Sequence, residues 1–159
     1  MNRRVEFFQA SPELTKKLQE LGQLTQHGSL GNTIIDLVNI RASQLNGCAF
    51  CLDMHSKEAK IHGERELRLY HVAIWRESPL FSEKERAALE WTEAVTKLCR
   101  DHLDDETYER VRKQFSEKEI SELTFAIGVI NTWNRLCIPL RVPPGIADEA
   151  FGLTKADLK

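Results

Sequence analysis

Hydrophobic residues recur along this chain at the three- and four-residue spacing of amphipathic helices, and no segment alternates long enough to predict a strand. Helix-start and helix-end signals predict helices over residues 12 to about 28, 32–46, 48 to about 63, 64 to about 76, a long segment after 82, about 105–115, and a long segment after 116. Capping boxes of the form Ser-x-x-Glu begin the two long segments, at Ser82 and at Ser116. The pattern therefore predicts an all-α fold.

The last predicted helix has an apolar centre. Between Ile120 and Cys137 the run TFAIGVI is apolar on every side, which is typical of the buried centre of a domain or of an oligomer interface. Arg135 lies in the same helix and needs a partner there. The prolines that follow, from Pro139 onward, break the helical pattern, so we expect a short tail from about residue 141. The length fits a single domain over residues 1–159.

The composition is that of an ordinary globular protein, with 42% hydrophobic and 29% charged residues. The 22 basic and 24 acidic side chains leave a formal charge of -2 without long runs of one sign, so we expect neither a nucleic-acid partner nor a membrane partner. Apolar stretches fall well short of the ~20 residues that a membrane span needs. The N-terminus lacks the apolar segment of a signal peptide, and we expect a cytoplasmic location.

Two of the four cysteines form a C-x-x-C motif at the start of the third predicted helix. At about 100° per residue, Cys48, Cys51 and His55 share one stripe of that helix. The two thiols are close enough to form a disulfide, and the unpaired N–H groups of a first helical turn favour a reactive thiolate. We expect Cys51, one turn from His55, to attack the substrate, and Cys48, at the more accessible helix entrance, to resolve the adduct.

Asp36 is the candidate orienting acid. If the helices on either side of Gly47 fold back on each other, Asp36 lies about one helical turn from His55 and can hold the imidazole, directly or through a water. The alternative is a solvated acid in an apolar segment. His62 shares the stripe of Cys51 but lies about 16 Å further along the helix axis, too far for contact. We expect surface or cap positions for the other histidines: His27, His62, His71 and His102.

The segment RASQLNGCAFCLDMHSKEAKIHG resembles the core of the carboxymuconolactone decarboxylase and alkylhydroperoxidase D-like superfamily, and the likeness extends over about residues 20–140. The family pattern is an acid twelve residues before C-x-x-C and a histidine four residues after it. Asp36, Cys48, Cys51 and His55 hold those positions here. Asp36 replaces the family's glutamate, and Phe50 stands where some peroxidases of the family have a histidine.

The resemblance implies an all-α homo-oligomer, a trimer or a hexamer. It also implies a catalytic dithiol that reduces hydroperoxides with electrons from an external dithiol donor. No bound cofactor and no metal are expected. Decarboxylases of the superfamily do not depend on paired thiols, so the presence of both Cys48 and Cys51 favours the redox branch.

Three other readings of the motif remain open. Zinc could use Cys48, Cys51 and His55 with Cys99 or Cys137 as the fourth ligand, although a helical chain of this length folds without a metal. Without zinc, the two isolated cysteines are expected to be reduced, buried hydrophobes. The same dithiol could serve a redox-sensing scaffold oxidised stoichiometrically. A decarboxylase acting on a lactone acid is the third possibility.

Overall fold

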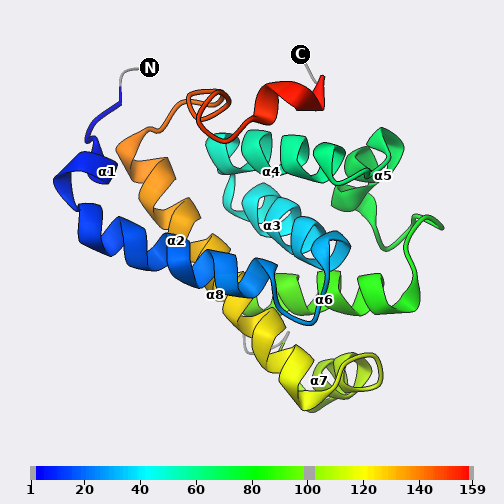
Figure 1. Ribbon diagram of the computed structural model, residues 1–159. Helices are drawn as coiled ribbons and strands as arrows, with labels where there is room; N and C mark the ends of the chain where they lie inside the picture. Colours follow the sequence, from blue (N-terminus) through cyan, green and yellow to red (C-terminus); the bar gives the residue numbers. More distant parts are fainter. Residues whose placement is uncertain (1–2, 99–102, 158–159) are drawn as a thin grey trace.

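The computed structural model describes residues 3–98 and 103–157, and every regular element within them is helical, as predicted (Figure 1). The elements, in chain order, are α1 (Phe7–Ala10), α2 (Pro12–Gln26), α3 (Asn32–Asn46), α4 (Ala49–Ile61), α5 (Glu66–His71), the 3-10 helix η1 (Val72–Ile74), α6 (Glu83–Lys97), α7 (Asp105–Arg112), α8 (Glu117–Leu140) and the 3-10 helix η3 (Leu153–Ala156). None of these helices combines the length and the apolar character that crossing a bilayer requires.

The two long helices begin where the capping boxes predict. In α6 the Ser82 side chain accepts the backbone N–H of Glu85, and the Glu85 carboxylate accepts the backbone N–H of Ser82. Ser116 and Glu119 repeat the arrangement at the start of α8. Each box satisfies N–H groups that the first helical turn leaves without a partner.

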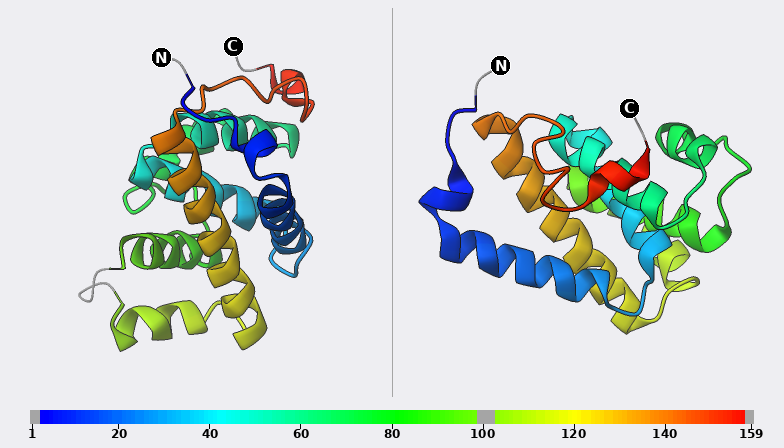
Figure 2. Two further views of the ribbon diagram at one scale, coloured as in Figure 1. Left: turned by 90° about the vertical axis from the view of Figure 1, so that its left-hand side faces the viewer. Right: turned by 45° about the horizontal axis from the view of Figure 1, so that its top comes forward.

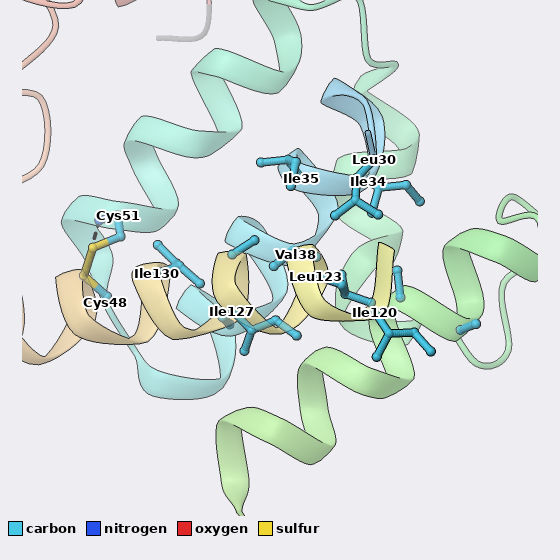
Figure 3. Packing of buried hydrophobic residues seen from close by; sticks show 14 of the residues in the cluster. Leu30, Ile34, Ile35, Val38, Cys48, Cys51, Ile120, Leu123, Ile127 and Ile130 are labelled. Carbon is cyan, nitrogen blue, oxygen red and sulfur yellow. Dashed lines mark hydrogen bonds between the residues drawn. A yellow bond between two sulfur atoms is a disulfide. The ribbon is translucent and has the colours of Figure 1, made fainter. Parts of the chain in front are cut away.

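The core is built around α3, which packs against α4, α6 and α8. From α3, Ile35 and Val38 are almost completely buried, and they meet Leu123, Ile127 and Ile130 of α8 in one cluster (Figure 3). Burying an aliphatic side chain of this size contributes about 1.5–3 kcal/mol. This packing fixes α3, the scaffold on which the neighbouring helix α4 is positioned.

The structure departs from the predicted elements at three places. The fourth predicted helix is shorter than expected, because α5 ends at His71 and the tighter turn of η1 buries Val72. Pro139 was expected to break the last helix, yet it lies inside the final turn of α8. Its missing N–H costs one hydrogen bond near the end, and the helix stops at Leu140. The short helix α1 carried no clear sequence signal.

The C-terminal segment crosses α4, the helix that carries the C-x-x-C motif (Figures 1 and 2). Lys57 of α4 is buried and its Nζ lies 2.8 Å from both Asp53 Oδ2 and Asp148 Oδ2. The backbone N–H of Gly145 also donates to Asp53, at 3.0 Å. These bonds join the tail to α4 on the charged side of that helix.

Candidate active site

The motif lies at the joint of an antiparallel helical hairpin. Gly47 ends α3 in the left-handed conformation, with φ at 71°, which glycine adopts without a steric penalty. The chain then turns directly into α4. Cys48 is the N-cap of α4, and its backbone N–H donates to the carbonyl of Ser43 at 3.0 Å. The sequence Asn-Gly-Cys thus places the first thiol at the entrance of the second helix.

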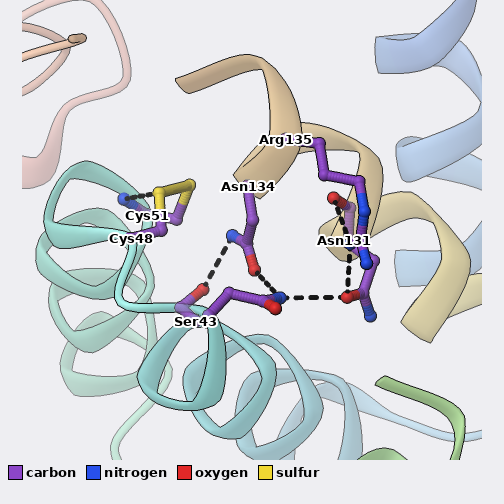
Figure 4. Close-up of a disulfide and its surroundings, with 7 residues drawn as sticks. Ser43, Cys48, Cys51, Asn131, Asn134 and Arg135 are labelled. Atoms are coloured by element: carbon purple, nitrogen blue, oxygen red, sulfur yellow. Dashed lines mark hydrogen bonds between the residues drawn. A yellow bond between two sulfur atoms is a disulfide. The ribbon is translucent and has the colours of Figure 1, made fainter. Parts of the chain in front are cut away.

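Cys48 and Cys51 form a disulfide, with their Cα atoms 5.4 Å apart (Figure 4). The Cys48 sulfur also accepts the backbone N–H of Cys51, at 3.3 Å. The predicted pairing is present. However, the expected difference in access is not, because Cys48 is 2% exposed and Cys51 is 1% exposed. Both sulfurs therefore lie beneath the surface of the chain.

Cys137, one of the two isolated cysteines, takes no part in this bridge. Cys137 is a free thiol in the core, as expected, and burial raises its pKa to about 12. A thiol with so high a pKa is a poor nucleophile at neutral pH. Cys99 lies outside the described residues.

His55 is buried one turn along α4 from Cys51, as the spacing predicted. Its Nδ1 lies 2.6 Å from Oε2 of Glu58, three residues further along the same helix. A carboxylate only accepts, so this bond places the shared proton on Nδ1 and leaves Nε2 for another partner. Burial acts to raise the pKa of Glu58, but the hydrogen bond from His55 and the charges of His55 and His62 lower it below its ordinary value.

No direct hydrogen bond joins Asp36 to His55, so the direct form of that prediction was wrong about the partner. Oδ2 of Asp36 lies 2.7 Å from Nδ1 of His62 instead. The reason is the register of the hairpin. Counting outward from Gly47 places Asp36 opposite Glu58, so its short side chain reaches the histidine at the end of α4. The i,i+3 position gives His55 a nearer carboxylate on its own helix.

Asp36 itself is unusual. Only 3% of the residue is exposed, and its Oδ1 is buried without a hydrogen-bond partner among the described residues. Burial raises the pKa of Asp36, and this effect outweighs the bond from His62, which acts to lower it. Both residues line an open, polar pocket of about 340 Å³. The remaining lining residues are Thr33, Gly63, Glu64, Arg65 and Arg68.

Reasoning from sequence missed Glu58 and the pairing of His62. The signal for Glu58 was present, because a carboxylate three residues after a histidine on a helix lies on the same face. His62 is the C-cap of α4, as the cap-position prediction allowed, but the prediction gave it no partner. Within residues 3–98 and 103–157, no group of three or more His, Cys, Asp or Glu side chains is arranged to hold a metal ion.

Residues 12–94 match the model of the carboxymuconolactone decarboxylase family. The chain is 39% identical to the uncharacterized protein YdfG of Bacillus subtilis over 140 residues, which cover 88% of this chain and 95% of YdfG. The family match over residues 12–94 includes the whole α3–α4 hairpin.

Solved structures agree on the architecture. A protein of unknown function from Agrobacterium tumefaciens, suggested to be the antioxidant defence protein AhpD, superposes with a TM-score of 0.87 at 41% identity, over 91% of this chain and 99% of that one. An uncharacterized peroxidase-related protein from Silicibacter superposes with a TM-score of 0.76 at 16% identity, over 86% of this chain and 72% of that one. The second likeness concerns the fold alone.

Proposed function

The chain belongs to the carboxymuconolactone decarboxylase family, and on that premise we propose that it is a thiol-dependent peroxidase of the alkylhydroperoxidase kind. The observation that carries the proposal is the Cys48–Cys51 disulfide at the N-terminus of α4, one turn from an imidazole paired with a carboxylate. A dithiol that closes into a disulfide at a helix start is the arrangement of redox-active C-x-x-C sites.

In the proposed cycle the Cys51 thiolate attacks a peroxide oxygen. The S–O bond forms as the O–O bond breaks, and the departing alkoxide takes a proton from His55 to leave as an alcohol. Cys48 then attacks the sulfur of the Cys51 sulfenic acid. Its own proton and the hydroxide leave together as water, and the disulfide forms. An external dithiol supplies the two electrons and two protons that restore both thiols.

The assignment of Cys51 as the attacking thiol depends on the balance of two effects. The N–H of Cys51 donates to the Cys48 sulfur, and the helix N-terminus favours a thiolate at Cys48 by about 0.3–1 kcal/mol. A hydrogen bond between a thiolate and an ionised imidazole is stronger, about 1.5–3 kcal/mol. Since His55 lies one turn from Cys51 and the carboxylate of Glu58 holds its Nδ1, we assign the attack to Cys51.

Glu58 takes the orienting role in this proposal. Its carboxylate holds Nδ1 of His55 and directs Nε2 away from the bond, so the imidazole can exchange a proton at one defined atom. Asp36 bonds His62 and not His55, so it acts on His55 through its charge only. The family's acid position is thus occupied here, but by a residue that bonds His62.

We also propose that the protein is a homo-oligomer, a trimer or a hexamer, assembled through α2 and α8. These helices border an apolar groove of about 560 Å³ that includes Leu18, Leu21 and Val129. Phe125, in the apolar run of α8, also lines the groove and is 59% exposed. A symmetric, closed assembly is the usual way in which such surfaces are covered.

Turnover separates an enzyme from a sensor. Reduced protein is supplied with excess dithiothreitol and an alkyl hydroperoxide, and peroxide loss is followed after subtraction of the rate without protein. We expect consumption of many equivalents per Cys48–Cys51 pair, its loss in Cys51→Ser, and its retention in the matched control Cys137→Ser. Consumption that stops at one equivalent per pair would show a stoichiometric sensor and contradict the proposal.

A further inference from the structure

The turn that carries Cys48 is held against α8 by a network of amide side chains (Figure 4). Asn46, the last residue of α3, donates from Nδ2 to Oδ1 of Asn131 at 2.9 Å and to Oδ1 of Asn134 at 2.8 Å. Asn46 and Cys48 are separated only by Gly47. The Asn46 side chain therefore joins the end of α3, just before Cys48, to two residues of α8.

Asn134 makes a second connection to the same turn. The residue has no exposed surface, and its Nδ2 donates to Oγ of Ser43 at 3.3 Å. The carbonyl of Ser43, in turn, accepts the backbone N–H of Cys48 at 3.0 Å. Asn134 thus contacts the last turn of α3 through both Asn46 and Ser43, which lie three residues apart on one face of that helix.

Asn131 is itself held in place. Its Nδ2 donates to Thr96 Oγ1 at 3.0 Å and to the carbonyl of Ile127 at 2.9 Å. Arg135, which is exposed, donates to Asn131 Oδ1 at 2.8 Å. The amide nitrogen and oxygen of both Asn131 and Asn134 have partners, which restricts how these two side chains can rearrange.

A constraint of this kind acts on the two redox states unequally. In the disulfide form the S–S bond already restricts the turn, and the amide network adds little further ordering. In the dithiol form that bond is absent, and the network adds to the N-cap bonds that keep the Cys48 sulfur near Cys51. Holding two groups near each other raises their effective concentration and favours the bond between them.

We propose that Asn46 and Asn134 are positioning residues of the dithiol site, which favour disulfide formation by holding the Cys48 turn on α8. The inference deepens the proposed dithiol cycle and rests on it for its biological meaning. Neither residue touches the substrate in this account; both act through the position of Cys48.

Redox equilibration with dithiothreitol tests the role directly. In this exchange the S–S bond breaks, two thiols form, and dithiothreitol closes to its cyclic disulfide, so electrons and protons balance. For Asn46→Ala we expect the equilibrium constant for Cys48–Cys51 disulfide formation to fall about fivefold, since one net hydrogen bond is worth roughly two- to tenfold. A fivefold change corresponds to about 20 mV in a two-electron couple.

The matched control is Thr124→Val, a substitution on the same helix, α8. It removes the 3.0 Å hydrogen bond that Trp91 Nε1 of α6 donates to Thr124, and Thr124 has no hydrogen bond to a residue of the turn. We expect it to leave the redox equilibrium unchanged. Asn134→Leu is the second test variant, and we expect it to shift the equilibrium in the same direction. Asn134 is fully buried, so this variant can fail to fold; Asn46 is partly exposed, and Asn46→Ala then carries the test.

A merely structural network gives a different result. Asn46→Ala would then lower the free energy of unfolding equally in the oxidised and the reduced protein, with a redox equilibrium identical to that of Thr124→Val. That outcome overturns the proposal. The measurement uses no peroxide, so a protein that fails to turn over hydroperoxide can still show the redox shift, and the two failures remain distinguishable.

Discussion

Replacing Glu58 with glutamine removes the negative charge from the carboxylate that holds His55 while it keeps the shape of the side chain. A hydrogen bond between charged partners is worth about 1.5–3 kcal/mol. The Glu58 side chain is 32% exposed, so solvent screens the interaction, and the lower figure of about 1.5 kcal/mol applies. The bond and the charge of His55 lower the pKa of Glu58, so the pair favours a proton shared with an ionised carboxylate, and glutamine removes that preference.

The expected consequence is a higher titration midpoint for the Cys51 thiol, because a less favoured imidazolium stabilises the thiolate less. In a Cys48→Ser background, we expect Glu58→Gln to raise the midpoint by about 0.5–1 pH unit. The assay is the ultraviolet absorbance of the thiolate followed against pH.

Asp36→Asn is the matched control, since that carboxylate bonds His62 rather than His55. We expect a rise of less than about 0.3 pH unit, from the loss of a more distant charge. A midpoint that moves with Asp36→Asn and stays fixed with Glu58→Gln would refute the pairing on which this reasoning depends.

Three further predictions concern other parts of the molecule. Hydrogen bonds from Lys84 and from the Ser116 N–H lower the pKa of Glu119 to about 2. A carboxyl whose pKa is lowered in the folded state stabilises the fold at pH values above its pKa in the unfolded chain, so Glu119→Gln should cost about 1 kcal/mol at neutral pH. That cost should disappear as the pH falls towards 2, in urea unfolding at a series of pH values; a constant cost would contradict it. Cys137 should react with a thiol reagent only at the rate of unfolding, and faster labelling of the native protein would disprove its burial. Phe125→Lys should reduce the assembled mass measured by light scattering, whereas an unchanged mass would exclude the α2–α8 face as an interface.

Much of the fold could be predicted from the sequence because its signals are local. Capping boxes, the Asn-Gly pair and the first-turn Pro12 act within four residues, and each places a helix end correctly. The helix that Pro139 was expected to break shows the limit of such signals. A proline in the last turn removes only one bond, so the helix reaches Leu140 before it stops.

The candidate site was predictable along α4 and not across the hairpin. The spacing of Cys48, Cys51 and His55 follows from helix geometry alone. The partner of Asp36 depends on how two helices align and on the length of one side chain. Asp36 stands opposite Glu58, about one turn from His55 and about one turn from His62, and no pattern in the sequence reports which of the two it bonds.

The amide network on α8 was also beyond a reading of the sequence. Only Arg135 was expected to need a partner, because a charge on an apolar helix is conspicuous. The asparagines nearby looked like ordinary polar residues. Their roles depend on long-range contacts with Asn46 and Ser43, about 90 positions earlier in the chain.

The central claim is that Cys51 attacks peroxide and Cys48 resolves the product. The most direct measurement is mass spectrometry of reduced protein after one equivalent of an alkyl hydroperoxide, with a reagent that traps sulfenic acids. We predict a Cys48–Cys51 disulfide in the unsubstituted protein and a trapped sulfenic acid at Cys51 in Cys48→Ser. A sulfenic acid that forms at Cys48 in Cys51→Ser, with none at Cys51 in Cys48→Ser, would contradict the account.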